Sequence, residues 1–172
     1  MAAWHLPHRI PTDWTMMAKS VFYSFHYEHD VHRVQLVRNI HALEGQPLLD
    51  SQDWETVKRQ GDAAIKQWID KQMNYKKAVI VLVGKHTAGR KWVKYEIRRA
   101  WEIGKPLLGI RIHGISSMGS TDSPGTSPFD PASGIPLFDP TVTDHLGRID
   151  SAATYKKLEN NLELWSFCGV TK

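Results

Sequence analysis

The sequence predicts an α/β fold in which helices cover both faces of a mainly parallel sheet. Two observations lead to this fold class. Short apolar segments alternate along the chain with segments whose apolar residues recur at helical spacing, and this alternation is typical of parallel sheets. The clearest of the short segments, Ala78–Gly84, is apolar throughout, as expected of a parallel strand that is buried on both faces.

Five strands are expected, each marked by apolar, β-branched or aromatic residues: Lys19–Phe25, Gln46–Asp50, Ala78–Gly84, Pro106–Ile112 and Ile135–Asp139. Four helices are expected from apolar residues at helical spacing: about 28–43, about 62–73, the segment around Val93–Trp101, and about 152–167. Residues 51–61 are interpreted as a polar connection, and residues 113–134, rich in Gly, Ser and Pro, as a long loop. Among doubly wound folds, five strands favour the flavodoxin-like order 2-1-3-4-5.

The chain length of 172 residues and the composition suit a single globular domain. Residues 1–18 are expected to form an irregular arm, and residues 19–172 the single domain. No run of about 18 apolar residues is present, and the one cysteine, Cys168, excludes an internal disulfide. We therefore expect no membrane span and a cytoplasmic location. The net charge of +4 comes without a basic–aromatic motif, so nucleic acid is not expected as the main ligand.

The predicted topology brings two loops together. In doubly wound folds, ligands bind beyond the carboxyl ends of the strands, at the switch point between strands 1 and 3. Residues 24–30 form one loop at this point and residues 84–91 form the other. Trp92 and Glu96 follow in the first turns of the next helix. Glu96 lies about 100° around that helix from the core residue Ile97, so we expect it to edge the crevice.

Each candidate residue has a structural interpretation beside the functional one. Glu96 is either a surface acid paired with a nearby arginine or a carboxylate that stabilises a cationic transition state. Lys85 and His86 belong either to a solubilising loop or, with backbone N–H groups, to a phosphate site. Asp30 either caps a helix or contacts a ligand, and Trp54 either stacks on a ligand or packs on the core.

Three histidines are spaced three residues apart: His26, His29 and His32. They could share a metal if all three lay on one helix. His26 is expected to precede the helix, however, and no matching set of carboxylates or cysteines is present. We therefore expect no metal site.

Three stretches of the chain resemble a known family: KSVFYSFHYEHD from Lys19, VHRVQLVRN from Val31, and KAVIVLVGKHTAGRKWVKYEIRRAWEIGKPLLGIRI from Lys77. Over about residues 19–112 their order and spacing resemble the TIR-like domains of bacteria, in particular the TIR component of the Thoeris anti-phage system. The C-terminal YKKLENNLELW also resembles the last helix of that family. The resemblance implies a flavodoxin-like TIR fold. It also implies an NAD nucleosidase or ADP-ribosyl cyclase that cleaves the nicotinamide–ribose bond, with NAD as substrate and no further cofactor.

In this family the catalytic glutamate lies four residues after a tryptophan in the helix that follows strand 3, a pattern matched here by Trp92 and Glu96. Glu96 would then hold the ribose hydroxyls and stabilise the oxocarbenium ion. The other expected substrate-binding residues are assigned by position: Phe25 and His26 at the nicotinamide end, Asp30, Lys85 and His86 at ribose or phosphate, Trp92 as a pocket wall and Trp54 against a base.

The resemblance also implies partners. Thoeris proteins of this type make a cyclic ADP-ribose isomer or related nucleotide, and catalytic TIR domains often need self-association. We therefore expect NAD, a separate effector reached through a diffusible nucleotide, a phage-derived trigger and a homo-oligomer as partners. Cyclisation and plain hydrolysis both stay open. The alternative function is a non-catalytic TIR-like interaction module that signals by assembly.

Overall fold

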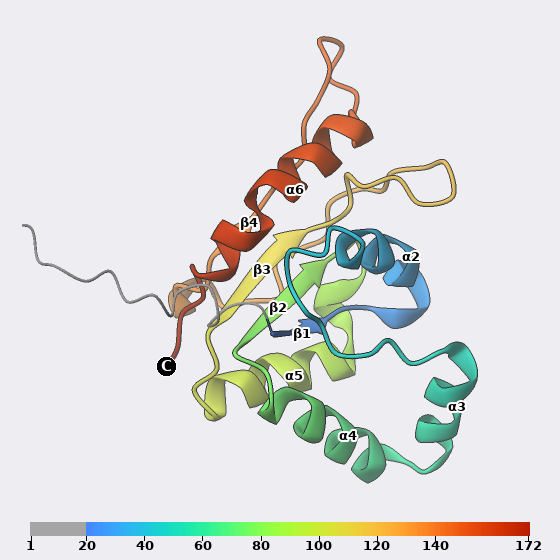
Figure 1. The fold of residues 1–172 in the computed structure, drawn as a ribbon, viewed down its shortest axis with the longest axis vertical. Coiled ribbons are helices and arrows are strands. Elements are labelled where there is room, and N and C mark those ends of the chain that lie inside the picture. The colour runs from blue at the N-terminus through green and yellow to red at the C-terminus, as the bar shows by residue number, and fades with distance from the viewer. Residues whose placement is uncertain (1–19) are drawn as a thin grey trace, which may run out of the picture.

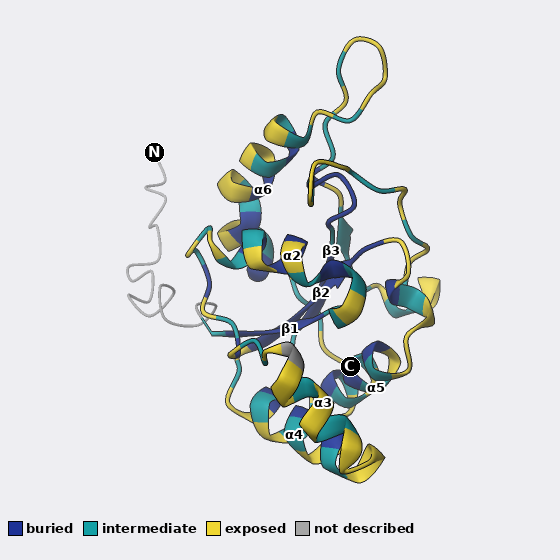
Figure 2. Ribbon diagram, turned by 90° about the vertical axis from the view of Figure 1, so that its right-hand side faces the viewer, coloured by how far each residue is buried: buried dark blue, intermediate teal, exposed yellow. Residues whose placement is uncertain are grey.

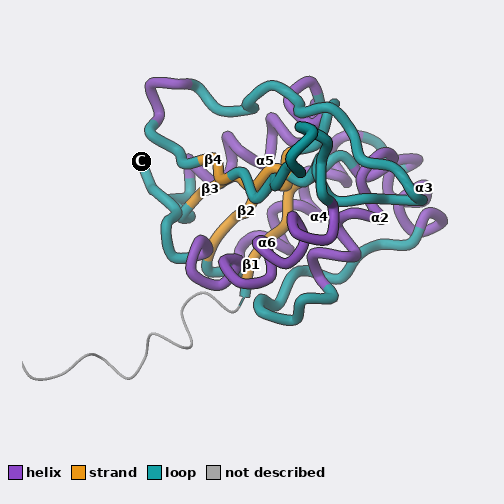
Figure 3. Tube along the Cα trace, turned by 90° about the horizontal axis from the view of Figure 1, so that it is seen from above, coloured by secondary structure: helices purple, strands orange, loops and turns teal. Residues whose placement is uncertain are grey.

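The computed structural model describes residues 20–172, apart from the side chain of Ser51. Within this range four strands form one parallel sheet in the order β1–β2–β3–β4. Their bounds are Val21–Ser24 (β1), Ala78–Val83 (β2), Leu107–Arg111 (β3) and Leu137–Phe138 (β4). Figure 3 shows the strands side by side in this order. Because all four run in one direction, the loops that follow β1 and β2 leave the sheet at the same edge.

Five α-helices are present among the described residues: Tyr27–Arg38 (α2), Ser51–Arg59 (α3), Asp62–Asn74 (α4), Lys91–Glu102 (α5) and Ser151–Ser166 (α6). Two short 3-10 helices, Thr87–Gly89 and Pro131–Ser133, lie in the connections. In Figure 1, α2 and α6 lie on one side of the sheet, and α4 and α5 lie on the other. No helix in the described part of the chain has the length and apolar character needed to cross a membrane.

Side chains along the central strand alternate between two apolar layers. Ile80 packs in one cluster with Val34 of α2 and Leu158 of α6. Its neighbour Val81 packs in the other cluster with Ile69 of α4. Figure 2 shows the strands as buried between exposed outer helix faces. This two-sided burial explains the continuous apolar run, and it confirms the predicted parallel sheet with helices on both faces.

The predicted second strand, 46–50, is wrong, so the sheet has four strands among the described residues and not five. Glu44 forms a single parallel bridge beside β1. Beyond it the side chain of Gln46 replaces a strand: its Oε1 accepts a hydrogen bond from the Tyr23 N–H at 2.8 Å, and its Nε2 donates to the Tyr23 carbonyl at 2.7 Å. Pro47 has no N–H group and cannot extend a ladder. The order of the remaining strands is that of the flavodoxin-like prediction without strand 2.

The predicted polar connection over residues 51–61 is also wrong, because most of it forms α3. The side chain of Asp50 caps this helix by accepting a hydrogen bond from the Asp53 N–H at 2.7 Å. Trp54 and Val57, one turn apart, are the described residues of this helix that pack against the core, and two apolar residues are too short a pattern to separate a helix from a polar connection. The helix brings Trp54 to the carboxyl edge of the sheet.

The remaining predicted boundaries agree with the structure more closely. The first helix ends at Arg38 and not near residue 43, because His41 adopts a left-handed conformation with φ of 56°. The loop at 113–134 is largely irregular, as expected, with one short 3-10 helix near its end. The predicted N-terminal arm, residues 1–18, lies outside the described residues.

Candidate active site

A cavity of about 250 Å³ lies beyond the end of β1, between this strand, α3 and α5. Its walls are mainly aromatic: Phe22, Tyr23, Phe25, Tyr27, Trp54, Trp68 and Trp92. Its polar groups come from six further side chains: His26, Glu28, Gln46, Lys58, Arg90 and Lys91. Glu96 is the second carboxyl group of the lining, besides Glu28. An apolar hollow with a few polar groups is the usual form of a small-molecule site.

Glu96 is the buried acid of this cavity. It projects from the second turn of α5, and the residue is only 8 % exposed. The hydroxyl of Ser24, the last residue of β1, donates a hydrogen bond to its Oε2. Glu96 lines the cavity, as expected of a residue that edges the crevice, and it is also buried, which the sequence did not indicate. The alternative of a surface pair with an arginine fails, because Arg99 pairs with Asp70 at 3.1 Å and with Glu102.

Burial sets the protonation of this acid. It raises the pKa of Glu96 from its usual 4.5 to about 8, while the hydrogen bond from Ser24 acts in the opposite direction. Desolvation disfavours a carboxylate when no cation balances it. Glu96 is therefore mainly protonated at neutral pH in the empty cavity. A cationic ligand group placed beside it would favour the ionised form.

His26 is the second enclosed polar residue of the cavity. It precedes α2 as the N-cap residue, is 8 % exposed, and makes no capping hydrogen bond with its side chain. Neither ring nitrogen has a hydrogen-bond partner among the described residues. Burial, and next the charge of Arg90, lower the pKa of His26, so the neutral imidazole is favoured. A neutral ring with free nitrogens can donate to or accept from a ligand.

The aromatic residues predicted for the site do line the cavity. The ring centroid of Tyr27 lies 6.1 Å from that of Phe25 and 5.9 Å from that of Trp54. Trp92, on α5, carries the Lys91 ammonium 4.8 Å from its ring centroid. Thus Phe25, His26, Trp54, Trp92 and Glu96 are brought together.

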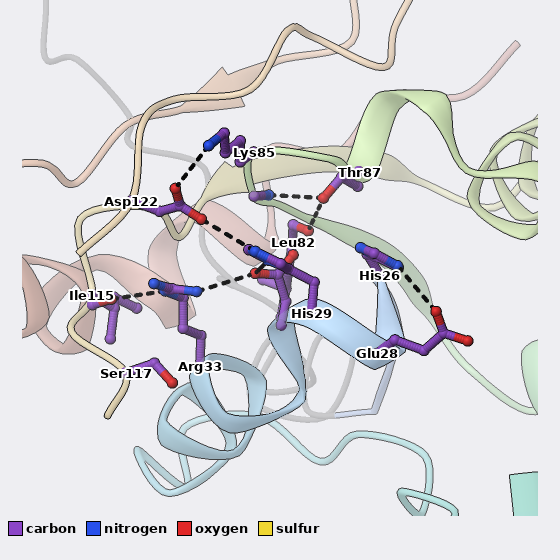
Figure 4. Close-up of polar contacts among 12 residues, drawn as sticks. His26, Glu28, His29, Arg33, Leu82, Lys85, Thr87, Ile115, Ser117 and Asp122 are labelled. Carbon is purple, nitrogen blue, oxygen red and sulfur yellow. Dashed lines mark hydrogen bonds and ion pairs between the residues drawn. The ribbon is translucent and has the colours of Figure 1, made fainter. Parts of the chain in front are cut away.

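The other three predicted residues, Asp30, Lys85 and His86, do not line the cavity. Asp30 and Lys85 belong instead to a polar network, of which Figure 4 shows His29, Arg33, Lys85 and Asp122. His86 packs edge-on against the ring of His29. Asp30 is 1 % exposed. Its Oδ1 is hydrogen-bonded to His29 Nδ1 at 3.0 Å and accepts a hydrogen bond from Arg33 Nη1 at 3.4 Å. Asp122 of the long loop lies 3.9 Å from the Lys85 ammonium. The network ties the start of α2 to two loops.

Sequence reasoning missed several residues of the cavity. Ser24 was not among the predicted site residues, yet its hydroxyl donates a hydrogen bond to the carboxyl group of Glu96. Gln46 lines the cavity while it pairs with the edge of β1. Arg90 and Lys91 line it from the start of α5. The available signal was a lone polar residue, Ser24, at the carboxyl end of an apolar strand.

Comparison with known proteins places these observations in a family context. A family model described as "Thoeris protein ThsB, TIR-like domain" matches residues 22–117, more than half of the chain. A protein of Bacillus cereus (strain MSX-D12), described as "Putative cyclic ADP-D-ribose synthase ThsB1", is 37 % identical over 120 residues. That match covers 66 % of this chain and 62 % of the length of the relative. The matched region contains the described cavity residues from β1 to α5.

Proposed function

Since the chain belongs to the TIR-like domain family of the Thoeris protein ThsB, we propose that it cleaves the nicotinamide–ribose bond of NAD and forms a cyclic ADP-ribose-type nucleotide. The observation that carries the proposal is the position of Glu96. It is a buried carboxyl group that makes no ion pair with any described residue, and aromatic side chains enclose it. Buried acids with a raised pKa in a cavity are frequent at functional sites.

The proposed chemistry follows from charge. Nicotinamide in NAD is a cationic ring, and its departure with the bonding electron pair leaves an oxocarbenium ion on the ribose. The ionised Glu96 stabilises this cation and accepts hydrogen bonds from the ribose hydroxyls. The positive nicotinamide ring itself lowers the pKa of Glu96 on binding, so that substrate generates the carboxylate that the reaction needs. Ser24 holds this carboxyl group in place.

The second step decides the product. A ring nitrogen of the adenine in the same molecule attacks the ribose carbon and closes a cyclic nucleotide, with release of one proton. Attack by water gives linear ADP-ribose and also releases one proton. The aromatic wall of Phe25, Tyr27, Trp54 and Trp92 limits access of water to this carbon, which favours ring closure.

The cavity suits the nicotinamide riboside half of NAD. Its volume of about 250 Å³ is small for a whole dinucleotide. We place nicotinamide against Phe25 and His26, whose free ring nitrogens can bind the carboxamide. The phosphates then run past Arg90 and Lys91, which line the cavity on the α5 side. This replaces the expected phosphate contacts of Lys85 and His86.

The wider role is also a proposal. The product would diffuse through the cytoplasm to a separate effector, and a phage-derived trigger would start its synthesis. The relative's description as a cyclic ADP-D-ribose synthase supports this assignment. Self-association is retained as an expected property of the active form.

The test is the product mixture formed from NAD by the concentrated protein and by extracts of phage-infected cells that express it, measured by liquid chromatography with mass spectrometry. Glu96→Gln should lower NAD turnover by at least about a hundredfold. Glu102→Gln is the matched control, because Glu102 lies on the same helix but is exposed and pairs only with Arg98 and Arg99. It should retain wild-type turnover.

Each product outcome has a defined meaning. A cyclic ADP-ribose mass that disappears in Glu96→Gln supports the synthase. Linear ADP-ribose alone makes the protein an NAD hydrolase. Absence of turnover in both settings refutes the enzyme and leaves the assembly module.

A further inference from the structure

A cluster of metal-type ligands lies next to the cavity at the start of α2. It comprises His26, His29 and Asp30, and one ligand atom from each lies within 4.8 Å of the others. His29 and Asp30 lie in the first turn of α2, and His26 precedes the helix as its N-cap residue. His32, the third histidine of the sequence pattern, is exposed and does not join them. The sequence pattern showed no carboxylate to complete a metal site with the histidines, and in the structure Asp30 takes that position.

Unpaired buried atoms are an independent sign of a missing partner. His26 is 8 % exposed, and both of its ring nitrogens lack a hydrogen bond among the described residues. Oδ2 of Asp30, a residue only 1 % exposed, likewise has no partner. The contact between His26 and Glu28 is long, at 3.9 Å, and Glu28 is largely exposed. An unsatisfied buried polar atom lowers the stability of the fold, and a bound ion would remove that cost.

The site is open to solvent on one side. The side chain of His29 is 33 % exposed, and its ring lies parallel to that of His26 with centroids 5.9 Å apart. The exposed His86 packs edge-on against His29, with centroids 5.0 Å apart. An ion can therefore enter past His29. Figure 4 shows His26 and His29 coming from the same end of α2.

We propose that His26, His29 and Asp30 form a binding site for a divalent ion of the Zn²⁺ type. Two imidazoles and one carboxylate are a donor set of zinc sites that keep a position open. The ion would replace the proton between His29 Nδ1 and Asp30 Oδ1, now 3.0 Å apart, and that proton would pass to solvent.

The charges around the site set its selectivity. Arg33, 3.4 Å from Asp30, already neutralises much of that carboxylate, and Asp122 lies 3.5 Å from His29 Nε2. Because the nitrogen donors outnumber the carboxylates, the site should prefer Zn²⁺ or Co²⁺ to Mg²⁺ or Ca²⁺. The ion would also hold the ring of His26, which lines the cavity, in one orientation.

The experiment is calorimetric titration of the metal-free full chain with Zn²⁺, and with Mg²⁺ for comparison. The wild type should bind one Zn²⁺, and His29→Ala should weaken binding by at least about tenfold. His32→Ala is the matched control, since His32 lies on the same helix outside the cluster, and it should bind as the wild type does. Equal affinity in all three proteins, or the absence of stoichiometric binding by the wild type, overturns the proposal.

A second readout does not depend on the variants folding equally well. Co²⁺ added to the wild type should give visible absorption bands of a site with nitrogen and oxygen donors. A thiolate-to-cobalt band would instead assign binding to the exposed Cys168 and overturn the proposal. Thermal unfolding of His29→Ala without metal checks that its fold is retained.

Discussion

Asp30 and Glu96 are both buried acids at the carboxyl edge of the sheet, but the protein compensates their charges differently. Asp30 is 1 % exposed and lies 3.4 Å from the guanidinium of Arg33 and 3.0 Å from the ring of His29. Glu96 is 8 % exposed, and within residues 20–172 its side chain has one hydrogen-bond partner, the neutral hydroxyl of Ser24. Asp30 is part of an ionic network, whereas Glu96 makes no ion pair among the described residues, although Arg90 and Lys91 line the same cavity.

This difference indicates where the function lies. A paired buried acid stabilises its surroundings only as part of the pair, and both members must stay. An unpaired buried acid lowers the stability of the fold at neutral pH, so its retention calls for another reason. A cationic substrate is such a reason. This contrast supports the two proposals, a structural and metal-binding role for Asp30 and a catalytic role for Glu96.

The largest expected effect on stability is that of Glu96→Gln. The folded pKa of about 8 exceeds the ordinary 4.5, so the wild type loses stability as pH rises from about 4.5 to about 8. Glutamine does not ionise and avoids this loss. Urea unfolding at pH 5 and pH 9 should therefore show a gain that grows with pH, up to about 4 kcal/mol. Parallel pH dependences of the two proteins would contradict an uncompensated Glu96.

Asp30→Asn should change the stability of the fold in the opposite direction to Glu96→Gln. It leaves the guanidinium of Arg33, itself 5 % exposed, without its anion, and should destabilise the fold by about 3 kcal/mol. The midpoint of urea unfolding at pH 7 measures this change. Glu28→Gln is the control, because Glu28 pairs with Lys58 at the surface and should change stability by less than about 1 kcal/mol. Equal effects of the two substitutions would show that Asp30 is not the anchor of its network.

Ser24→Ala should give the smallest effect, seen in the pH profile rather than in stability. The Ser24 hydrogen bond lowers the pKa of Glu96, so its loss raises that pKa further. The rise of kcat/KM for NAD with pH, which we expect near pH 8, should move up by about one pH unit. Ser166→Ala, which removes another buried serine hydroxyl on α6, is the control. An unshifted profile would remove Ser24 from the site.

The sequence alone was sufficient for the layers of the fold and for the position of Trp92 and Glu96 at the cavity, while the role of Glu96 stays a prediction. Two-sided burial of β2 produces its apolar run, and the spacing of Trp92 and Glu96 on α5 is fixed by the helix. The sequence pattern gave no reason to exclude the strand expected at 46–50. Its apolar residues resemble a strand, but the edge of β1 is paired by the Gln46 side chain. Side-chain pairing of this kind leaves no periodic signal.

The composition of the cavity was harder to predict. By position, all loop residues near the strand ends are candidates for the site. The structure shows that Phe25 and His26 line the cavity. Asp30 and Lys85 belong instead to the polar network. The burial of Glu96 depends on segments far apart in the sequence, from β1 to α5. Local patterns cannot report such long-range packing.

The most direct test of the account is the titration of the Glu96 carboxyl carbon by carbon-13 NMR, with and without an NAD analogue whose ribose is carbocyclic and cannot form an oxocarbenium ion. The account predicts a pKa of about 8 in the free protein and a decrease of about 1–3 pH units when the cationic nicotinamide ring binds. A free-protein pKa near the ordinary 4.5, or a value that the analogue leaves unchanged, would contradict the assignment of Glu96 as the group that stabilises the cation.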